Sequence, residues 1–420
     1  MSQYKTLSGV QISFDNKKEN IIKDNLVALI LSIQSGDIFA GFHVSPPLLV
    51  ISSIIQVGAV REEELIASLA FAAGVEIQGE KQIDLPVFFE ALGKKAHDYL
   101  QRPHQEFHLV FPLNLRRGKI PFERIEVNRE SFEVISWEET RGRYDIPNLQ
   151  AMIHDSIHFQ HHQEYWSDQG SALLLKIYCR SAEEAFRKGE KAYDNFLSSI
   201  NYILDTSITI HLAGNSPYAK VVPSVGYGVF LPTGDLDCPY IDREFLNYQH
   251  LCSDEFNADK LRAILELTRS ERKIDQRFMQ ALRLHSDGLK TTNWDASFLS
   301  FWRVLEILAF GERTDYDMND VVKRTCVLLK ANSKTKDFLN LCASRRNSLV
   351  HRGVFSSEGQ PLVLTIKIFS KLCLSRFEKL LQEYRTEQMI EKYFEIVDFT
   401  TEQLTEQRTV IENILKERNL

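Results

Sequence analysis

Residues 297–308 read SFLSFWRVLEIL, and this stretch decides the fold class of the second half of the chain. It lies within a helix that apolar periodicity predicts over 295–310, with Gly311 as its stop. The same reasoning predicts helices over 258–286, 319–331, 334–352, 361–385 and 386–417, the first of them ending at Ser286-Asp287-Gly288. Strand patterns almost disappear beyond residue 255. The sequence therefore predicts an all-α domain over 256–420.

The first half of the chain has a different pattern. Apolar runs predict strands over 107–111, 124–127, 132–135, 173–177 and 208–210. Ser181 and Glu184 have the spacing of a capping box, and an apolar periodic run follows them to about Leu204. We therefore expect an α+β protein, in which a mixed α/β domain over 1–255 precedes the helical domain over 256–420.

Composition limits the class and location of the protein. The 420 residues are 44% hydrophobic and 25% charged, which is typical of a globular chain and excludes a disordered one. Six cysteines without a C-x-x-C pair predict reduced thiols, and no secretory signal opens the sequence, so a cytoplasmic location is expected. Residues 38–60 include no Asp, Glu, Lys or Arg, but Pro46-Pro47 would break a membrane-spanning helix. We expect a short apolar element there and no membrane span.

Charge is unevenly distributed along the chain. The first 255 residues hold 23 basic and 34 acidic residues, whereas the remainder holds 27 basic and 23 acidic residues. Within the second half, segment 323–352 has eight Lys or Arg residues and one acidic residue, Asp337. Such a segment fits either a solvated helical face or a surface that binds phosphate groups.

The segment 344–353 reads SRRNSLVHRG and places an arginine and a histidine close together on one predicted helix. Arg346 could hold a phosphodiester while the imidazole of His351 moves a proton. This spacing has little specificity by itself, because the chain pairs Arg with His at similar separations over 102–108 and 243–250. A simpler interpretation is that the basic side chains favour the negative end of the helix dipole before Gly353 caps the helix.

Helical geometry gives Arg346 an unusual environment. It falls at the edge of the apolar arc formed by Phe338, Leu341, Cys342 and Leu349. A guanidinium in such a place needs a carboxylate, a phosphate or a partner surface. Glu306, inside an otherwise apolar helix, is the candidate carboxylate; the alternative is that Glu306 is an ordinary surface residue.

The order of these elements resembles the HEPN superfamily, especially its Apea-like branch. The resemblance rests on the helix with residues 297–308, a short connecting helix, and a helix that ends in Arg346-Asn347-Ser348-Leu349-Val350-His351. The mark of that family is Arg, a polar residue, a short spacer and His near the end of a helix in a helical bundle. The resemblance covers about residues 256–386, and segment 173–203 is faintly similar to the mixed region that precedes the bundle in Apea-like proteins.

The resemblance implies a metal-independent endoribonuclease without a cofactor, acting as a homodimer in which two motifs face one cleft. It implies proton transfer by His351, phosphate binding by Arg346, orientation by Asn347, and positioning of Arg346 or His351 by Glu306. The expected RNA contacts are Arg345, Arg352, Lys323 and Arg324. It further implies a toxin or anti-phage effector of the abortive-infection type, acting on RNA such as tRNA. The N-terminal domain would then sense a trigger, restrain the nuclease or select the RNA.

Two other functions stay open at this point. A HEPN-like bundle can bind a nucleotide, RNA or a protein without cleaving anything. A metal-dependent hydrolase could use His154, His158 and His161 or His162, although Asp155 stands where the H-E-x-x-H zinc motif needs Glu.

The segment 315–320 begins like a calcium loop. It lacks the glycine that such a loop needs at its sixth position, and Cys326 stands in place of the twelfth-position Glu. We therefore expect Asn319 or Asp320 to cap a helix there instead.

Overall fold

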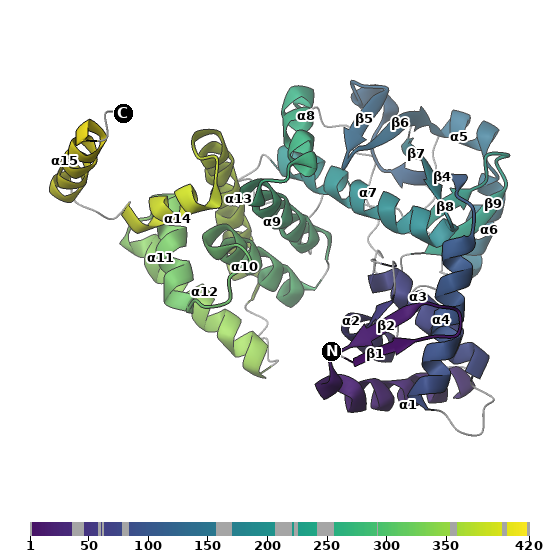
Figure 1. Ribbon diagram of the computed structural model, residues 1–420. Coiled ribbons are helices and arrows are strands. Elements are labelled where there is room, and N and C mark those ends of the chain that lie inside the picture. The colour runs from purple at the N-terminus through teal and green to yellow at the C-terminus, as the bar shows by residue number, and fades with distance from the viewer. Residues whose placement is uncertain are drawn as a thin grey trace.

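The structure, a computed structural model, describes residues 2–35, 46–57, 60, 63–77, 84–156, 170–205, 221, 226–241, 256–291, 293–352, 359–396 and 401–417. It confirms the α+β class, because two antiparallel sheets precede a long series of helices (Figure 1). Three packed parts follow one another along the chain, and a last helix, α15 (Thr401–Glu417), stands apart from them. Residues 402–413 of α15 are all exposed.

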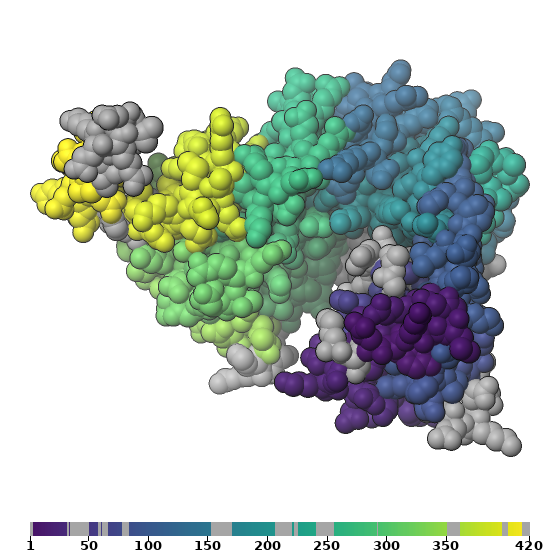
Figure 2. Space-filling view, viewed as in Figure 1, coloured from purple at the N-terminus to yellow at the C-terminus, as the bar shows by residue number. Residues whose placement is uncertain are grey.

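Residues 2–101 form a unit with a hydrophobic core of its own. Its sheet has the order β1-β2-β3, and Ile12, Leu29 and Phe88 belong to a core that is separate from the core of the rest of the described chain. The elements are β1 (Ser2–Lys5), β2 (Gln11–Phe14), α1 (Glu19–Ser35), α2 (Pro46–Ile54), β3 (Gln56–Val57), α3 (Glu63–Ile77) and α4 (Leu85–Gln101). Figure 2 shows this unit, in purple and dark blue, against the blue and teal part of the surface, with the yellow C-terminal helices at the opposite end.

The apolar element expected within 38–60 is helix α2. It has nine residues and begins at Pro46-Pro47, where the missing amide hydrogens cost the helix nothing. Across the described residues, no helix is both long and apolar enough to cross a membrane.

The middle part is a six-stranded antiparallel sheet with the order β5-β6-β7-β4-β8-β9. The strands predicted over 107–111, 124–127, 132–135 and 173–177 are confirmed, whereas 208–210 lies outside the described residues. The elements are β4 (Gln105–Leu113), β5 (Arg124–Val127), β6 (Glu130–Ser136), α5 (Trp137–Arg143), α6 (Ile146–Ser156), β7 (Ser171–Cys179), α7 (Ala182–Leu204), β8 (Gly226–Phe230) and β9 (Leu236–Ile241).

Helix α7 connects the sheet to the C-terminal helices. Ser181 caps its N-terminus by accepting a hydrogen bond from the Glu184 amide, as the sequence predicts. Towards the sheet, the ring of Tyr193 stacks on Phe111 with centroids 4.6 Å apart. Towards the bundle, Tyr202 meets Phe278 edge to face at 6.1 Å, and both groups of residues belong to one continuous core.

This packing corrects the predicted domain boundaries. A single domain over 1–255 is wrong, because residues 2–101 have their own core while residues 107–204 share a core with the helices beyond 256. The boundary expected near residue 255 is a change of secondary structure and not a break in packing.

The C-terminal part is helical, as predicted. Its bundle consists of α8 (Ala258–Glu266), α9 (Lys273–Lys290), α10 (Trp294–Phe310), α11 (Met318–Leu329), α12 (Ser333–Arg352), α13 (Gly359–Glu383) and α14 (Glu387–Ile396). Of the helix predicted over 386–417, the structure describes α14, which ends at Ile396, and α15, which begins at Thr401, while 397–400 lie outside the described residues. The prediction of one helix over 258–286 is wrong, because Ser270 to Arg272 interrupt it.

Gly288 does not end a helix, contrary to the prediction. Helix α9 continues to Lys290, and a Cβ on Gly288 would lie 2.6 Å from Cε1 of Phe301 on α10. The glycine therefore allows α9 and α10 to approach each other closely. The predicted helix cap also differs: Asp317 caps α11 in a reciprocal capping box with Asp320, and neither Asn319 nor Asp320 is the N-cap.

A buried polar cluster fastens the end of α7 to the bundle. His285 Nε2 lies 3.2 Å from Asp205 Oδ2, and His285 Nδ1 lies 2.8 Å from Ser370 Oγ. Lys367 Nζ lies 3.2 Å from the second oxygen of Asp205. His285 is 1% exposed and Ser370 is 0% exposed, so no substrate reaches this Ser-His-Asp set and its role is structural.

Burial and pairing shift the two titratable groups at the centre of this cluster. Burial lowers the pKa of His285 and outweighs the opposite effect of the Asp205 carboxylate. Burial opposes ionisation of Asp205, but the hydrogen bond with His285 and the charge of Lys367 outweigh it and hold the pKa of Asp205 well below its usual range. At neutral pH the imidazole of His285 is therefore neutral and the carboxylate of Asp205 is ionised.

Candidate functional site

The carboxylate of Glu306 lies in the interior of the bundle. Glu306 is on α10 and is only 5% exposed. Its Oε1 accepts a hydrogen bond of 2.8 Å from Nε1 of Trp302, one helical turn earlier. The same oxygen lies 3.4 Å from Nε of Arg346 on α12. The alternative interpretation of Glu306 as a surface residue is therefore wrong, and Arg346 has the carboxylate that its position on the helix requires.

The guanidinium of Arg346 contacts the protein through Nε, and its terminal nitrogens are on the opposite edge. Its side chain is 26% exposed, and its Nε is the nitrogen that faces Glu306. Among the residues that the structure describes, no hydrogen bond engages either terminal amino nitrogen of Arg346. The planar guanidinium could therefore keep its bond to the protein while its terminal nitrogens grip two oxygens of a phosphate.

Tyr316 and Arg303 complete the charged surroundings of this pair. Tyr316 lies in the connection between α10 and α11, where its ring stacks on Phe310 with centroids 4.4 Å apart. Burial raises the pKa of Tyr316, Glu306 adds to the rise, and Arg346 and Arg303 oppose it. The phenol is therefore protonated at neutral pH and can donate a hydrogen bond beside Arg346.

The rest of the motif lies on the last turns of α12. Asn347 is exposed, and the backbone of α12 carries His351 one turn beyond it; the side chains of His351 and Arg352 lie outside the described part of the chain. Cys342 and Leu349 are buried as the apolar arc predicts. Leu341 is 59% exposed, so its place in that arc is wrong, and Leu339 is buried instead.

The four basic residues expected to contact RNA have different surroundings. Arg345 faces the first turn of α10, where its charge lowers the pKa of Asp295 against the larger, opposite effect of burial. Lys323 is exposed on α11. Arg324 is engaged within the protein: its Nη1 lies 2.6 Å from Glu391 and 2.7 Å from the carbonyl oxygen of Ala309.

The histidine cluster over 154–162 falls almost entirely outside the described residues. Helix α6 includes positions 154–156, and the structure describes neither their side chains nor residues 157–162. In the part of the chain that is described, no group of three or more His, Cys, Asp or Glu residues could hold a metal ion.

Two members of the site escaped the sequence reasoning. Arg303 lies three residues before Glu306 on one helix, a spacing that places both on the same side and could have indicated it. No local sequence pattern indicated Tyr316, because it comes close to Glu306 and Arg346 only through the fold of the connection between α10 and α11. Comparison of the chain with protein-family models, curated proteins and solved structures found no match.

Proposed function

We propose that this protein is a metal-independent endoribonuclease of the HEPN type, and that it acts as a homodimer. The observation that carries the proposal is the contact between Arg346 and the buried Glu306, 3.4 Å apart. A buried carboxylate that holds one edge of an arginine fixes the direction in which the other edge points. An isolated basic helix end with no functional role has no need of that arrangement.

The reaction that suits these groups is attack of a ribose 2′-hydroxyl on the adjacent phosphorus. A bond forms between the 2′-oxygen and phosphorus, and the bond from phosphorus to the 5′-oxygen breaks. One His351 imidazole accepts the 2′-hydroxyl proton and a second imidazole returns a proton to the leaving 5′-oxygen. Arg346 stabilises the charge that develops on the phosphate, and the exposed Asn347 orients the substrate. The products are a 2′,3′-cyclic phosphate and a 5′-hydroxyl.

A second copy of the chain would supply the second imidazole. Val350 supports this arrangement, because it is 53% exposed and lies one turn beyond Arg346 on α12. In the proposed dimer, contact with the second copy would cover this apolar side chain. Val350→Arg should shift the protein to a monomer in light scattering and abolish cleavage, and a monomeric variant that cleaves at the wild-type rate would contradict the dimeric site.

The biological role that we propose is that of a cytoplasmic toxin or anti-phage effector. In this role the six-stranded sheet and the N-terminal unit, residues 2–101, would bind a phage-derived trigger or select the RNA. Cleavage of tRNA or other cellular RNA on triggering would then arrest the host cell.

The test is cleavage of total RNA and tRNA in EDTA by the wild type, Arg346→Ala and His351→Ala, with analysis of the product ends. Lys334→Ala is the matched control, because Lys334 is an exposed basic residue at the start of the same helix. We expect cyclic phosphate ends from the wild type and the control, and a loss of at least about 100-fold in both motif variants. Equal cleavage by all four proteins would refute the proposal, and RNA binding without cleavage in phage-infected lysate would favour a non-catalytic binding module.

A further inference from the structure

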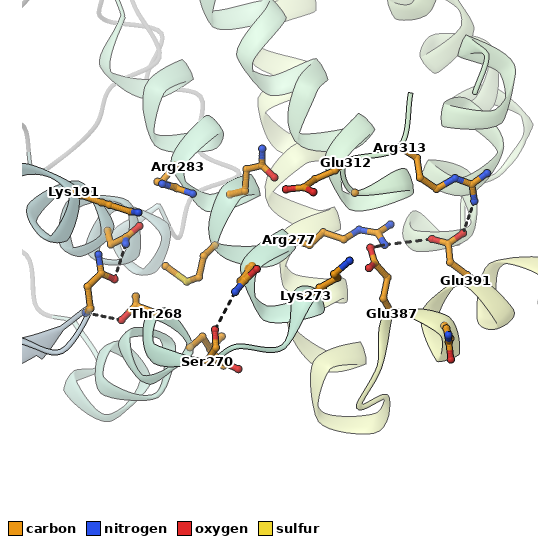
Figure 3. A pocket seen from close by; sticks show the side chains of 18 of the residues that line it. Lys191, Thr268, Ser270, Lys273, Arg277, Arg283, Glu312, Arg313, Glu387 and Glu391 are labelled. Carbon is orange, nitrogen blue, oxygen red and sulfur yellow. Dashed lines mark hydrogen bonds and ion pairs between the residues drawn. The ribbon is translucent and has the colours of Figure 1, made fainter. Parts of the chain in front are cut away.

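A large cleft lies between the six-stranded sheet and the bundle, and the described residues that line it include none of the candidate nuclease site. Its volume is about 1320 Å³, and its walls come from α7, the turn between β5 and β6, α9, the end of α10 and α14 (Figure 3). This exceeds the range of about 300–1,000 Å³ usual for sites that hold one small molecule. The cleft therefore has room for a ligand with several charged groups.

Three basic side chains in this cleft have no hydrogen-bond or ion-pair partner within the described part of the chain. They are Lys191 on α7 and Lys273 and Arg283 on α9. Their neighbours differ: Lys188 is paired with Glu184 at 2.7 Å, and Arg277 lies 3.3 Å from Glu391. Figure 3 shows Lys191 and Arg283 at one end of the cleft, with Arg313 and Glu391 at the other.

The polar lining at the cationic end is also suited to a ligand that carries oxygen atoms. The backbone amide of Asn128, in the turn between β5 and β6, donates to Thr268 Oγ1 at 2.9 Å, and so the sheet and the bundle meet at the floor of the cleft. Asn195 is 6% exposed, and its Oδ1 is buried without a hydrogen-bond partner among the described residues. A buried acceptor of this kind is costly unless a ligand or water donates to it.

The lining also indicates how a ligand would be recognised. Among the described residues that line the cleft, none is aromatic, whereas proteins that read unpaired bases stack them on aromatic rings. Uncompensated lysine and arginine side chains recognise phosphate oxygens regardless of the base. The described lining holds seven basic and five acidic side chains, so the cleft suits phosphate groups where its lysine and arginine side chains have no carboxylate partner.

We propose that this cleft binds a ligand through several of its phosphate groups, with Lys191, Lys273 and Arg283 as the main contacts. The site is separate from Arg346 and Glu306, and the proposal does not depend on nuclease activity. Two sources share this chemistry, a free polyphosphate compound such as a nucleoside triphosphate and the backbone of a nucleic acid.

The experiment measures binding to the full chain in EDTA with three probes: tripolyphosphate, a nucleoside triphosphate and a short single-stranded deoxyribonucleotide. The deoxyribonucleotide lacks the 2′-hydroxyl that the proposed cleavage requires, so its binding is read independently of cleavage. The test protein carries Lys191→Ala, Lys273→Ala and Arg283→Ala together. The control carries Lys176→Ala, Lys379→Ala and Arg385→Ala, which remove the same charge from exposed positions outside the cleft.

We expect the wild type and the control to bind, and the dissociation constant of the test protein to rise at least tenfold. If the deoxyribonucleotide is the ligand, the salt dependence of its binding should also weaken by about two units of slope, as expected for three lost phosphate contacts at about 0.7 each. Binding of tripolyphosphate and the triphosphate identifies a free phosphate ligand, and binding of the deoxyribonucleotide alone identifies a nucleic acid. The proposal is overturned if no probe binds the wild type, or if the test protein loses no more affinity than the control. Circular dichroism of both triple variants verifies that they fold.

Discussion

The pair formed by Glu306 and Arg346 leads to a quantitative prediction about coupling. Glu306→Gln removes the negative charge and keeps an oxygen that can accept the 2.8 Å hydrogen bond from Trp302. Arg346→Met removes the positive charge and keeps most of the side-chain volume. The two single variants and the double variant form a cycle that isolates the energy of the pair.

The expected coupling follows from the geometry. Two unit charges about 4 Å apart attract each other by about 4 kcal/mol at an effective dielectric constant near 20. Withdrawal of the Glu306 carboxylate from water cancels part of this attraction, and the 26% exposure of Arg346 screens more of it. We therefore expect a coupling of about 1–2 kcal/mol. Arg346→Met alone should cost more than the double variant, because it leaves a charged carboxylate buried with the Trp302 indole as its one hydrogen-bond partner among the described residues.

Native-state hydrogen exchange is the appropriate assay. The chain has two separate cores, so a single unfolding curve would mix their transitions. Exchange of amides in α10 and α12 reports the opening of these helices alone. Lys334→Met, an exposed change on α12, provides the control. Additive effects of the two single variants, within about 0.3 kcal/mol, would refute the reasoning.

Three further predictions concern stability. Arg277→Leu should lower the free energy of opening of α10 and α14, measured by hydrogen exchange, by about 3–5 kcal/mol. The reason is that Arg277 is 3% exposed and donates to the carbonyl oxygens of Ile307 and Leu308 at the end of α10. Lys273→Leu, at an exposed position on the same helix, should change this free energy little. The lowered pKa of His285 means that unfolding takes up a proton below pH about 6.5, so the stability of the core that holds His285 should fall with decreasing pH by up to about 1.4 kcal/mol per pH unit. His285→Gln should flatten this slope in native-state hydrogen exchange of α9 measured at several pH values. Gly311→Ala should lower the stability of α10 and α14 by about 1–3 kcal/mol in hydrogen exchange, since Gly311 has φ +64°, whereas Gly142→Ala, with open space around it, should not change the exchange of α5. Unchanged exchange of α10 in Gly311→Ala would contradict this account.

Local sequence patterns predicted most of the bundle correctly. The bounds of α10, α11 and α12 differ from the predictions by one residue or less at most ends, because apolar periodicity and end signals act within a few residues of each boundary. The errors occur where packing changes the meaning of a local signal. The local sequence around Gly288 is typical of a helix end, but α9 continues through this residue. The missing side chain instead allows Phe301 of α10 to pack closely against α9.

The candidate site was predictable only in part, for a related reason. Arg346 on the edge of an apolar arc required a counter-charge, and Glu306 was the one acidic residue within the apolar stretch 297–308. The approach of Tyr316 and the three unpaired cations of the cleft depend on elements that are far apart in the sequence. Lys191 and Arg283 share no local pattern, and their common cleft exists because α7 packs against α9.

Helix α7 has a practical consequence for dissecting this protein. Its residues pack into the sheet on one side and into the bundle on the other, with Asp205 and His285 joined in the interior between them. A bundle cut out at residue 256 would expose the rings and the histidine that α7 now covers, and it would precipitate or unfold rather than act as a portable module. The smallest fragment worth expressing runs from about residue 103 to about residue 396, and it leaves out both the N-terminal unit, which has its own core, and the exposed helix α15.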